Sequence, residues 1–140
     1  MQPLSEYVDS LRIISTHEHH QPFPPPEPAT LDYLLTHGYV AWCAVDPRYR
    51  ERFLDLICGN SYFVWYEKAL DDLFDFGGRI GLDNWDSISE KTADALGRPE
   101  FHEMIFRDKC RYIRAINDAY WDPGSDNGRP DLYAPTFRVN

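Results

Sequence analysis

The 140-residue sequence has few cysteines and a deficit of basic side chains. Its three cysteines, Cys43, Cys58 and Cys110, are widely spaced and form no CxxC pair, so we interpret them as reduced core thiols of a cytosolic protein. The 14 Lys and Arg residues against 23 Asp and Glu give a formal charge of −9. Such an acidic surface argues against a nucleic acid or an anionic membrane as the main partner.

Long apolar runs are also missing. No stretch approaches the roughly 20 apolar residues that a membrane-spanning helix needs. The first eleven residues, MQPLSEYVDSL, carry acids where a secretory signal would carry basic residues. The aromatic share is high at 15%, which favours bulky apolar anchors in a folded chain. These features predict a cytoplasmic protein with one core.

Hydrophobic periodicity and turn residues predict the order of the elements. Leu4, Tyr7, Val8 and Leu11 follow helical spacing, whereas LRIIST is short and β-branched. Thr30 is expected to cap a helix that ends before Gly38. In chain order, the expected elements are helix 4–11, strand 11–16, helix 31–36, a helix opened by Asp46-Pro47 and closed by Gly59, helices 61–76, 83–97 and 100–110, strand 110–118, and the start of a strand at 136–140.

Two strands separated by a long helical excursion favour a parallel sheet with helical crossovers, hence an α/β fold. We expect a single partial domain: residues 1–20 supply the first helix and strand, 21–110 the excursion, and 111–140 the second strand, a loop and the start of a third strand. The last residues favour a strand and carry no polar tail, so the chain is expected to be cut.

The segment HEHH, residues 17–20, is the main candidate for chemistry. On a strand, residues i and i+2 share a face, so His17 and His19 are expected to point into one space while Glu18 and His20 face away. Two neutral imidazoles can hold one divalent ion such as Zn²⁺. The helical zinc motif HExxH is excluded, because Gln21 occupies its last position and prolines follow. The alternative is a solvated strand end whose histidines only form hydrogen bonds.

Four segments resemble the amidohydrolase superfamily of metal-dependent hydrolases, in particular its uronate-isomerase-like branch. LRIISTHEHH is similar to the first strand of that family, although Ser15 stands where the family usually has Asp. GNSYFVWYEKALDDLFDFGGRIGLDNWDSIS resembles its helical insertion, and INDAYWDPGSD and APTFRVN resemble the end of its second strand and the approach to its third.

The resemblance implies the N-terminal part of a (β/α)8 TIM-like barrel with a large helical insertion between the first two strands. It implies a metal ion, Zn²⁺ in the first instance, on His17 and His19, and hydrolysis of a C–N or C–O bond of a small molecule by metal-activated water. The alternative within the family is a sugar-acid isomerase. The remaining family ligands come from later strands, so the chain is expected to be inactive alone.

Other polar and aromatic residues receive structural interpretations, with one exception. Arg138 is expected near the barrel mouth, where it could bind a substrate carboxylate; the alternative is a surface arginine without such a role. Salt bridging or solvation is expected for the carboxylates of Glu18, Asp118 and Asp122. A structural or exposed position is expected for His37 and His102. A core position is expected for Trp65 and Trp121. Bare strand edges would favour self-association into a homo-oligomer. The alternative from another class is a non-catalytic module whose helical region serves interaction.

Overall fold

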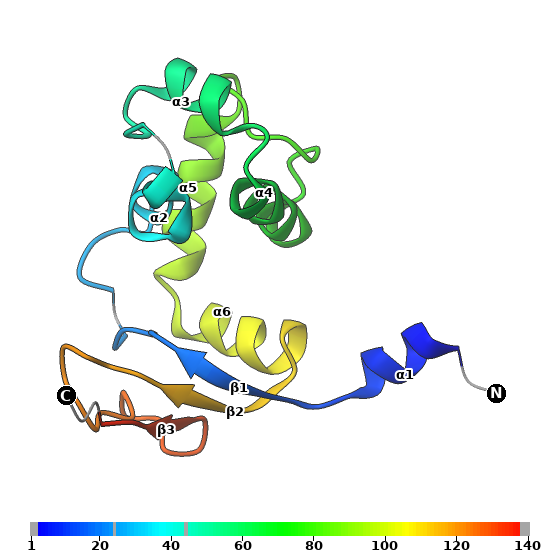
Figure 1. Cartoon of the computed structure of the whole chain (residues 1–140), viewed down its shortest axis with the longest axis vertical. Coiled ribbons are helices and arrows are strands. Elements are labelled where there is room, and N and C mark those ends of the chain that lie inside the picture. Colours follow the sequence, from blue (N-terminus) through cyan, green and yellow to red (C-terminus); the bar gives the residue numbers. More distant parts are fainter. Residues whose placement is uncertain (1–2, 24, 44, 138–140) are drawn as a thin grey trace. The chain divides into compact units, whose positions relative to one another are not determined.

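The computed structural model describes residues 3–23, 25–43 and 45–137. Within them lie six α-helices, one 3-10 segment, one π-helical segment and three strands (Figure 1). The helices are α1 (Leu4–Ser10), α2 (Leu31–His37), α3 (Arg50–Ile57), α4 (Ser61–Phe74), α5 (Trp85–Leu96) and α6 (Pro99–Glu103); η1 is Tyr39–Cys43 and η2 is Met104–Lys109; the strands are β1 (Ile13–Glu18), β2 (Tyr112–Asn117) and β3 (Tyr133–Pro135).

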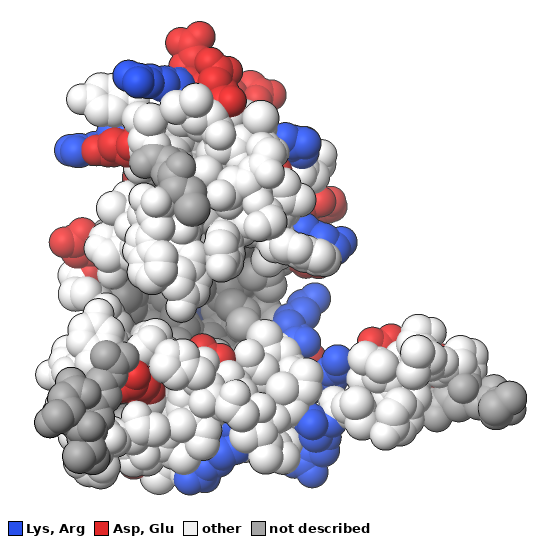
Figure 2. Space-filling model, in the orientation of Figure 1, with Lys and Arg blue, Asp and Glu red and all other residues white. Residues whose placement is uncertain are grey.

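The chain divides into two compact units. Residues 1–25 together with 98–140 form the sheet unit, and residues 26–97 form the helical unit. None of the helices in the described part of the chain is long and apolar enough to cross a membrane. In the view of Figure 2, basic side chains lie along the lower edge of the sheet unit, and the helical unit shows acidic and basic side chains next to one another.

The three strands form one open parallel sheet in the order β1-β2-β3. This confirms the predicted α/β class with a parallel sheet, and the sheet is not closed into a barrel. Ser15 pairs with Ala115, and Ala115 pairs in turn with Tyr133. The pairing of β1 is irregular, because three steps along β1 from Ser15 match two steps along β2. Such a bulge changes which face each later side chain occupies.

The third strand lies earlier than the sequence indicated. We predicted its start at residues 136–140, but β3 is Tyr133–Pro135. The buried side chain of Leu132 anchors the approach to β3, and its carbonyl accepts a hydrogen bond from the Ala115 N–H. Pro135 is tolerated because it ends the strand, where its missing N–H costs least. Residues 138–140 lie outside the described residues.

A small core lies on the sheet beneath η2, while parts of β1 are exposed. This core is made of Ala115, Leu132 and Tyr133, and the partly buried Phe106 of η2 and Tyr112 of β2 pack against it. By contrast, Ile14 of β1 is 53% exposed. The helix α1 has no buried residue, so its predicted apolar stripe is present but uncovered in the part of the chain that the structure describes.

The helical unit has its own larger core. Thr30 caps α2 as predicted, since its hydroxyl accepts from the Tyr33 N–H. The helix α4 begins at Ser61, as predicted. Asn60 caps it, because its amide oxygen accepts from two backbone N–H groups. Asp46-Pro47 does not open a helix. The Asp46 carboxylate accepts from the Arg48 N–H in a turn, and α3 begins at Arg50.

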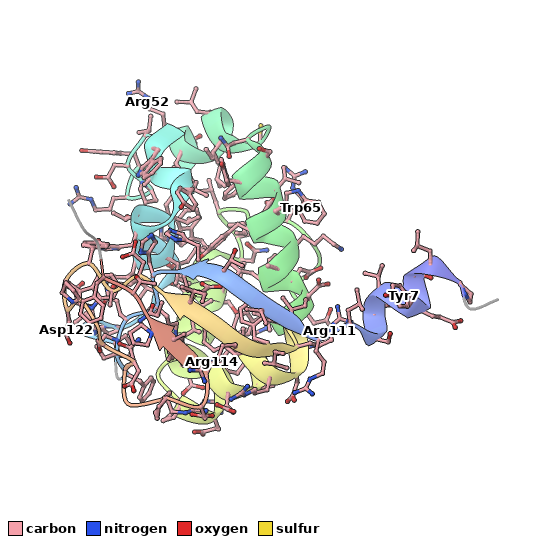
Figure 3. The ribbon with its side chains drawn as sticks, turned by 60° about the horizontal axis from the view of Figure 1, so that its bottom comes forward. Tyr7, Arg52, Trp65, Arg111, Arg114 and Asp122 are labelled. Carbon is pink, nitrogen blue, oxygen red and sulfur yellow. The ribbon has the colours of Figure 1, made fainter. Side chains whose placement is uncertain are left out.

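Trp65 and Cys58, both predicted in the core, prove to be exposed. Trp65 on α4 is 67% exposed and points away from the helix (Figure 3). Cys58, expected to be a core thiol, is exposed and free, while Cys110 is half-buried and free; the side chain of Cys43 is not among those described. The tryptophan that fills the helical core is Trp85, which is fully buried and donates its indole N–H to Asp32.

Trp85 and Trp65 provide a matched test of the helical core. Trp85→Ala should lower the free energy of unfolding by about 3–5 kcal/mol, because it leaves a large cavity and breaks a hydrogen bond. Trp65→Ala should change it by less than about 0.5 kcal/mol, since that ring packs little surface. Urea unfolding followed by circular dichroism measures both. A larger loss for Trp65→Ala than for Trp85→Ala would contradict this core.

Candidate metal site at the carboxyl ends of β1 and β2

The histidine pair lies at the carboxyl end of β1. His17 belongs to the strand and His19 follows its last residue, Glu18. Their Nε2 atoms are 2.9 Å apart, and the rings meet edge to face with centroids 4.5 Å apart. The structure therefore brings both imidazoles into one space. Both side chains are exposed.

A third ligand-type group, Asp118, completes the cluster. A nitrogen of His17, a nitrogen of His19 and a carboxylate oxygen of Asp118 all lie within 4.8 Å of one another. Asp118 follows directly after β2, and it is only 8% exposed. We had expected Asp118 to be solvated or salt-bridged. The signal for its position was available: parallel strands end at the same edge of a sheet, and Asp118 follows the strand next to β1.

Backbone hydrogen bonds hold this edge together. The Asp118 N–H donates to the Glu18 carbonyl over 2.7 Å. The buried Asn117 side chain accepts from the His20 N–H, and the Asn117 carbonyl accepts from the Thr136 N–H. The two histidines and the aspartate are thus fixed to all three strands. A site built on strand ends in this way is better defined than one on a free loop.

The tautomer of His19 follows from its second contact. Its Nδ1 lies 2.8 Å from the backbone carbonyl of Asp118. A carbonyl can only accept, so Nδ1 carries the proton and Nε2 presents a lone pair. A ligating histidine in metal sites commonly donates its other ring N–H to a backbone carbonyl or carboxylate in this way. The Nε2 atom of His19 is thus prepared for a cation or a donor.

Glu18 and His20 face away from the pair, as expected. The Ser15 hydroxyl donates to the Glu18 carboxylate over 2.6 Å. The His20 ring stacks on Tyr133 and contacts Phe106. Burial, followed by repulsion from His102, lowers the pKa of His20 to about 4. His20 is therefore neutral at pH 7 and acts as an aromatic side chain under η2.

The remaining candidate residues are placed as follows. Trp121, predicted in the core, is 37% exposed, and its ring contacts Tyr120, whose own ring lies 5.7 Å from His19. Asp122 is exposed in the loop after β2 (Figure 3). His37 is exposed, and its Nδ1 donates to the Tyr33 carbonyl. Arg138, the candidate for a substrate carboxylate, lies outside the described residues.

A network of ion pairs lies beside α6 and η2. Arg129 contacts Glu103 over 2.7 Å and Asp131 over 3.0 Å. Arg107 contacts the same two carboxylates, over 3.3 and 2.7 Å. Hydrogen bonds from Arg129 are the main cause that lowers the pKa of Asp131 to about 2, and they also lower the pKa of Glu103. Two positive and two negative groups thus compensate one another.

Comparisons with protein-family models, with curated proteins and with solved structures found no match to the chain. The geometry of the cluster therefore carries the functional argument. Two imidazole nitrogens and one carboxylate oxygen are a ligand set that zinc enzymes use, with an open position left for water.

The ion-pair network predicts how the Asp131 carboxyl group titrates at acid pH. The lowered pKa of Asp131 means that its ion pairs are fully formed above the ordinary value of 3.8 and are lost as the pH falls toward 2. An NMR titration of the side-chain carboxyl should show this pKa directly. Arg129→Gln should raise it toward 3.8, whereas Arg52→Gln on α3 should leave it unchanged. An Asp131 that titrates near its ordinary value in the unaltered chain would show that the pairs do not form.

Proposed function

We propose that His17, His19 and Asp118 bind a divalent metal ion, with Zn²⁺ as the best fit, and that the chain supplies the first strands of a metal-dependent hydrolase. The observation that carries this proposal is the convergence of their three ligand atoms within 4.8 Å. His17 lies in β1 and His19 directly after it, while Asp118 directly follows the neighbouring strand β2. Structural zinc sites use four protein ligands, whereas catalytic sites use three and keep a position open.

The donor set fits such an ion on its own chemistry. Imidazole nitrogen and carboxylate oxygen suit borderline ions such as Zn²⁺. In the absence of an ion, the His19 Nε2 lone pair can accept a hydrogen bond from His17 Nε2–H. For a cation to bind there, His17 would have to carry its proton on Nδ1, so that the Nε2 lone pairs of both rings face the ion. The hydrogen bond from His19 Nδ1 to the Asp118 carbonyl would keep the ring oriented in both states.

The sheet supports the reaction class. Consecutive parallel strands in the order β1-β2-β3 are the arrangement with which a (β/α)8 barrel begins, and such barrels carry their active sites at the carboxyl ends of the strands. The cluster lies at these ends. The resemblance to the amidohydrolase superfamily supports the same proposal through His17 and His19, whereas Asp118 is not among the ligands that the resemblance implies.

In the proposed site, the bound ion and the residues around it would have separate roles. A bound divalent ion would supply a water of lowered pKa and polarise the bond to be cleaved. Both histidines are exposed, so a small-molecule substrate can approach them. The ring of Tyr120, beside His19, offers an aromatic surface against which such a substrate could lie. The carbonyl of Asp118 keeps His19 in the tautomer that ligation needs.

Calorimetric titration with Zn²⁺ tests the site. The chain should bind about one ion, and the chelator EDTA should remove it. Binding should be lost in the double variant His17→Ala/His19→Ala. Asp118→Asn should weaken it at least tenfold, because loss of even a group that supports a ligand costs 10–100-fold in metal affinity. His37→Ala, which removes an exposed histidine of the helical unit, is the matched control and should bind as the unaltered chain does.

Two outcomes would count against the site. Unchanged Zn²⁺ affinity in the double histidine variant would refute the assignment altogether. Loss of affinity with the histidines, but none with Asp118→Asn, would restrict the site to the histidine pair and remove the three-ligand argument for a catalytic centre.

The second test concerns turnover. The 140-residue chain with Zn²⁺ should show no metal-dependent hydrolysis of amide or lactone substrates and no isomerisation of uronates. Catalysis needs a base within hydrogen-bond reach and exclusion of bulk water, while His17 and His19 are exposed on an open sheet. Turnover should require further strands that cover this sheet edge. Measured turnover in the chain alone that His17→Ala abolishes would mean that the site is already complete.

A further inference from the structure

A second group of side chains lines a cavity of about 180 Å³ in the sheet unit. It lies where α6 and η2 pack near the segment that leads into β3, and its lining includes His20, Phe23, Phe106 and Tyr133. It shares no lining residue with the His17/His19/Asp118 cluster. The proposed metal site therefore does not account for this cavity.

Aromatic rings form a continuous wall of the cavity. The Phe23 ring contacts the His102 ring with centroids 5.3 Å apart, and His102 contacts His20 at 5.5 Å. His20 continues the wall to Phe106 at 4.9 Å and stacks on Tyr133 at 5.5 Å, with the planes 20° apart. Each ring is held by a neighbouring ring. The wall offers both ring faces and ring edges, which suits another aromatic ring.

The polar side of the cavity carries compensated charges. Glu103 and Arg129 both line it and contact each other over 2.7 Å. Each also belongs to the network with Arg107 and Asp131 described above, in which two cations face two anions. A charged ligand would have to compete with these ion pairs. A neutral ligand could donate a hydrogen bond to the carboxylate and accept one from the guanidinium without separating them.

The size of the cavity limits the ligand to one ring. An apolar cavity of about 150 Å³ is known to take up benzene. A space of about 180 Å³ therefore accommodates a benzene-sized ring with one small substituent. Fused two-ring systems would have to extend through the open side.

We propose that this cavity is a binding site for a neutral, single-ring aromatic molecule that carries a carboxamide or hydroxyl group. The ring lies against the aromatic wall of Phe23, His20 and Tyr133. The substituent meets Glu103 and Arg129, which supply one acceptor and several donors. The site is independent of the metal proposal, because no ligand of the cluster takes part in it.

Fluorine NMR on the full chain, with para-fluorobenzamide as the probe, tests this site. The signal of the probe should broaden and shift with a Kd on the order of 1 mM, as expected for a ligand of about ten heavy atoms. Para-fluorobenzoate has the same ring and a negative charge, and it should bind at least tenfold more weakly. Addition of EDTA should change neither result.

Variants and shift mapping complete the test. Phe23→Ala should weaken binding of para-fluorobenzamide about fivefold through loss of one ring contact, and Phe23→Leu should weaken it less. Phe137→Ala, which removes an exposed phenylalanine that does not line the cavity, should bind normally. Protein amide shifts should move at His102, Phe106 and Tyr133 and not at His17. Absence of binding, equal affinity for the benzoate, or unchanged affinity in Phe23→Ala would each overturn the proposal.

Discussion

The parallel pairing of β1 with β2 is the contact on which the candidate site depends. His19 and Asp118 are 99 residues apart in the sequence, and only the alignment of these two strands brings them together. The entropy cost of closing a long loop grows slowly, by about 0.6 kcal/mol for each doubling of length. In this chain residues 26–97 of the intervening segment form a compact unit of their own. The strands therefore meet at the ends of an ordered insertion, not of a free loop.

The same pairing separates two environments at the sheet edge. His17 and His19 remain exposed beside Asp118, where nitrogen and oxygen ligands converge. One residue further, His20 turns under η2 among Phe106 and Tyr133, and burial lowers its pKa to about 4. The histidines of one short motif thus lie in different environments. The rings of His17 and His19 contact each other, whereas the His20 ring packs against Phe106 and Tyr133.

Local signals in the sequence predicted most of the elements and two of the three residues of the candidate site. The helical pattern of α4, the Thr30 cap and the β-branched run of β1 are local, and the structure has all three. His17 and His19 are two residues apart, so strand geometry alone places them together. Asp118 could not be assigned with the same ease, because its role depends on which strand lies next to β1. Trp65 was misjudged for a related reason: an aromatic residue on a helix does not reveal by itself which face the neighbouring helices cover.

The position of β3 shows how a strand can be decided by its surroundings. The sequence indicated a strand at TFRVN, of which the structure describes only Thr136 and Phe137. The segment that pairs with β2 is Tyr133–Pro135. Leu132 and Tyr133 bury their side chains in the small core under η2, and Arg129 is held by two carboxylates just before them. Burial and these ion pairs determine the register of β3 and outweigh the intrinsic strand preference of the residues. In this register the Asn117 carbonyl accepts a hydrogen bond from the Thr136 N–H. The residue directly after β3 therefore supports the residue next to Asp118.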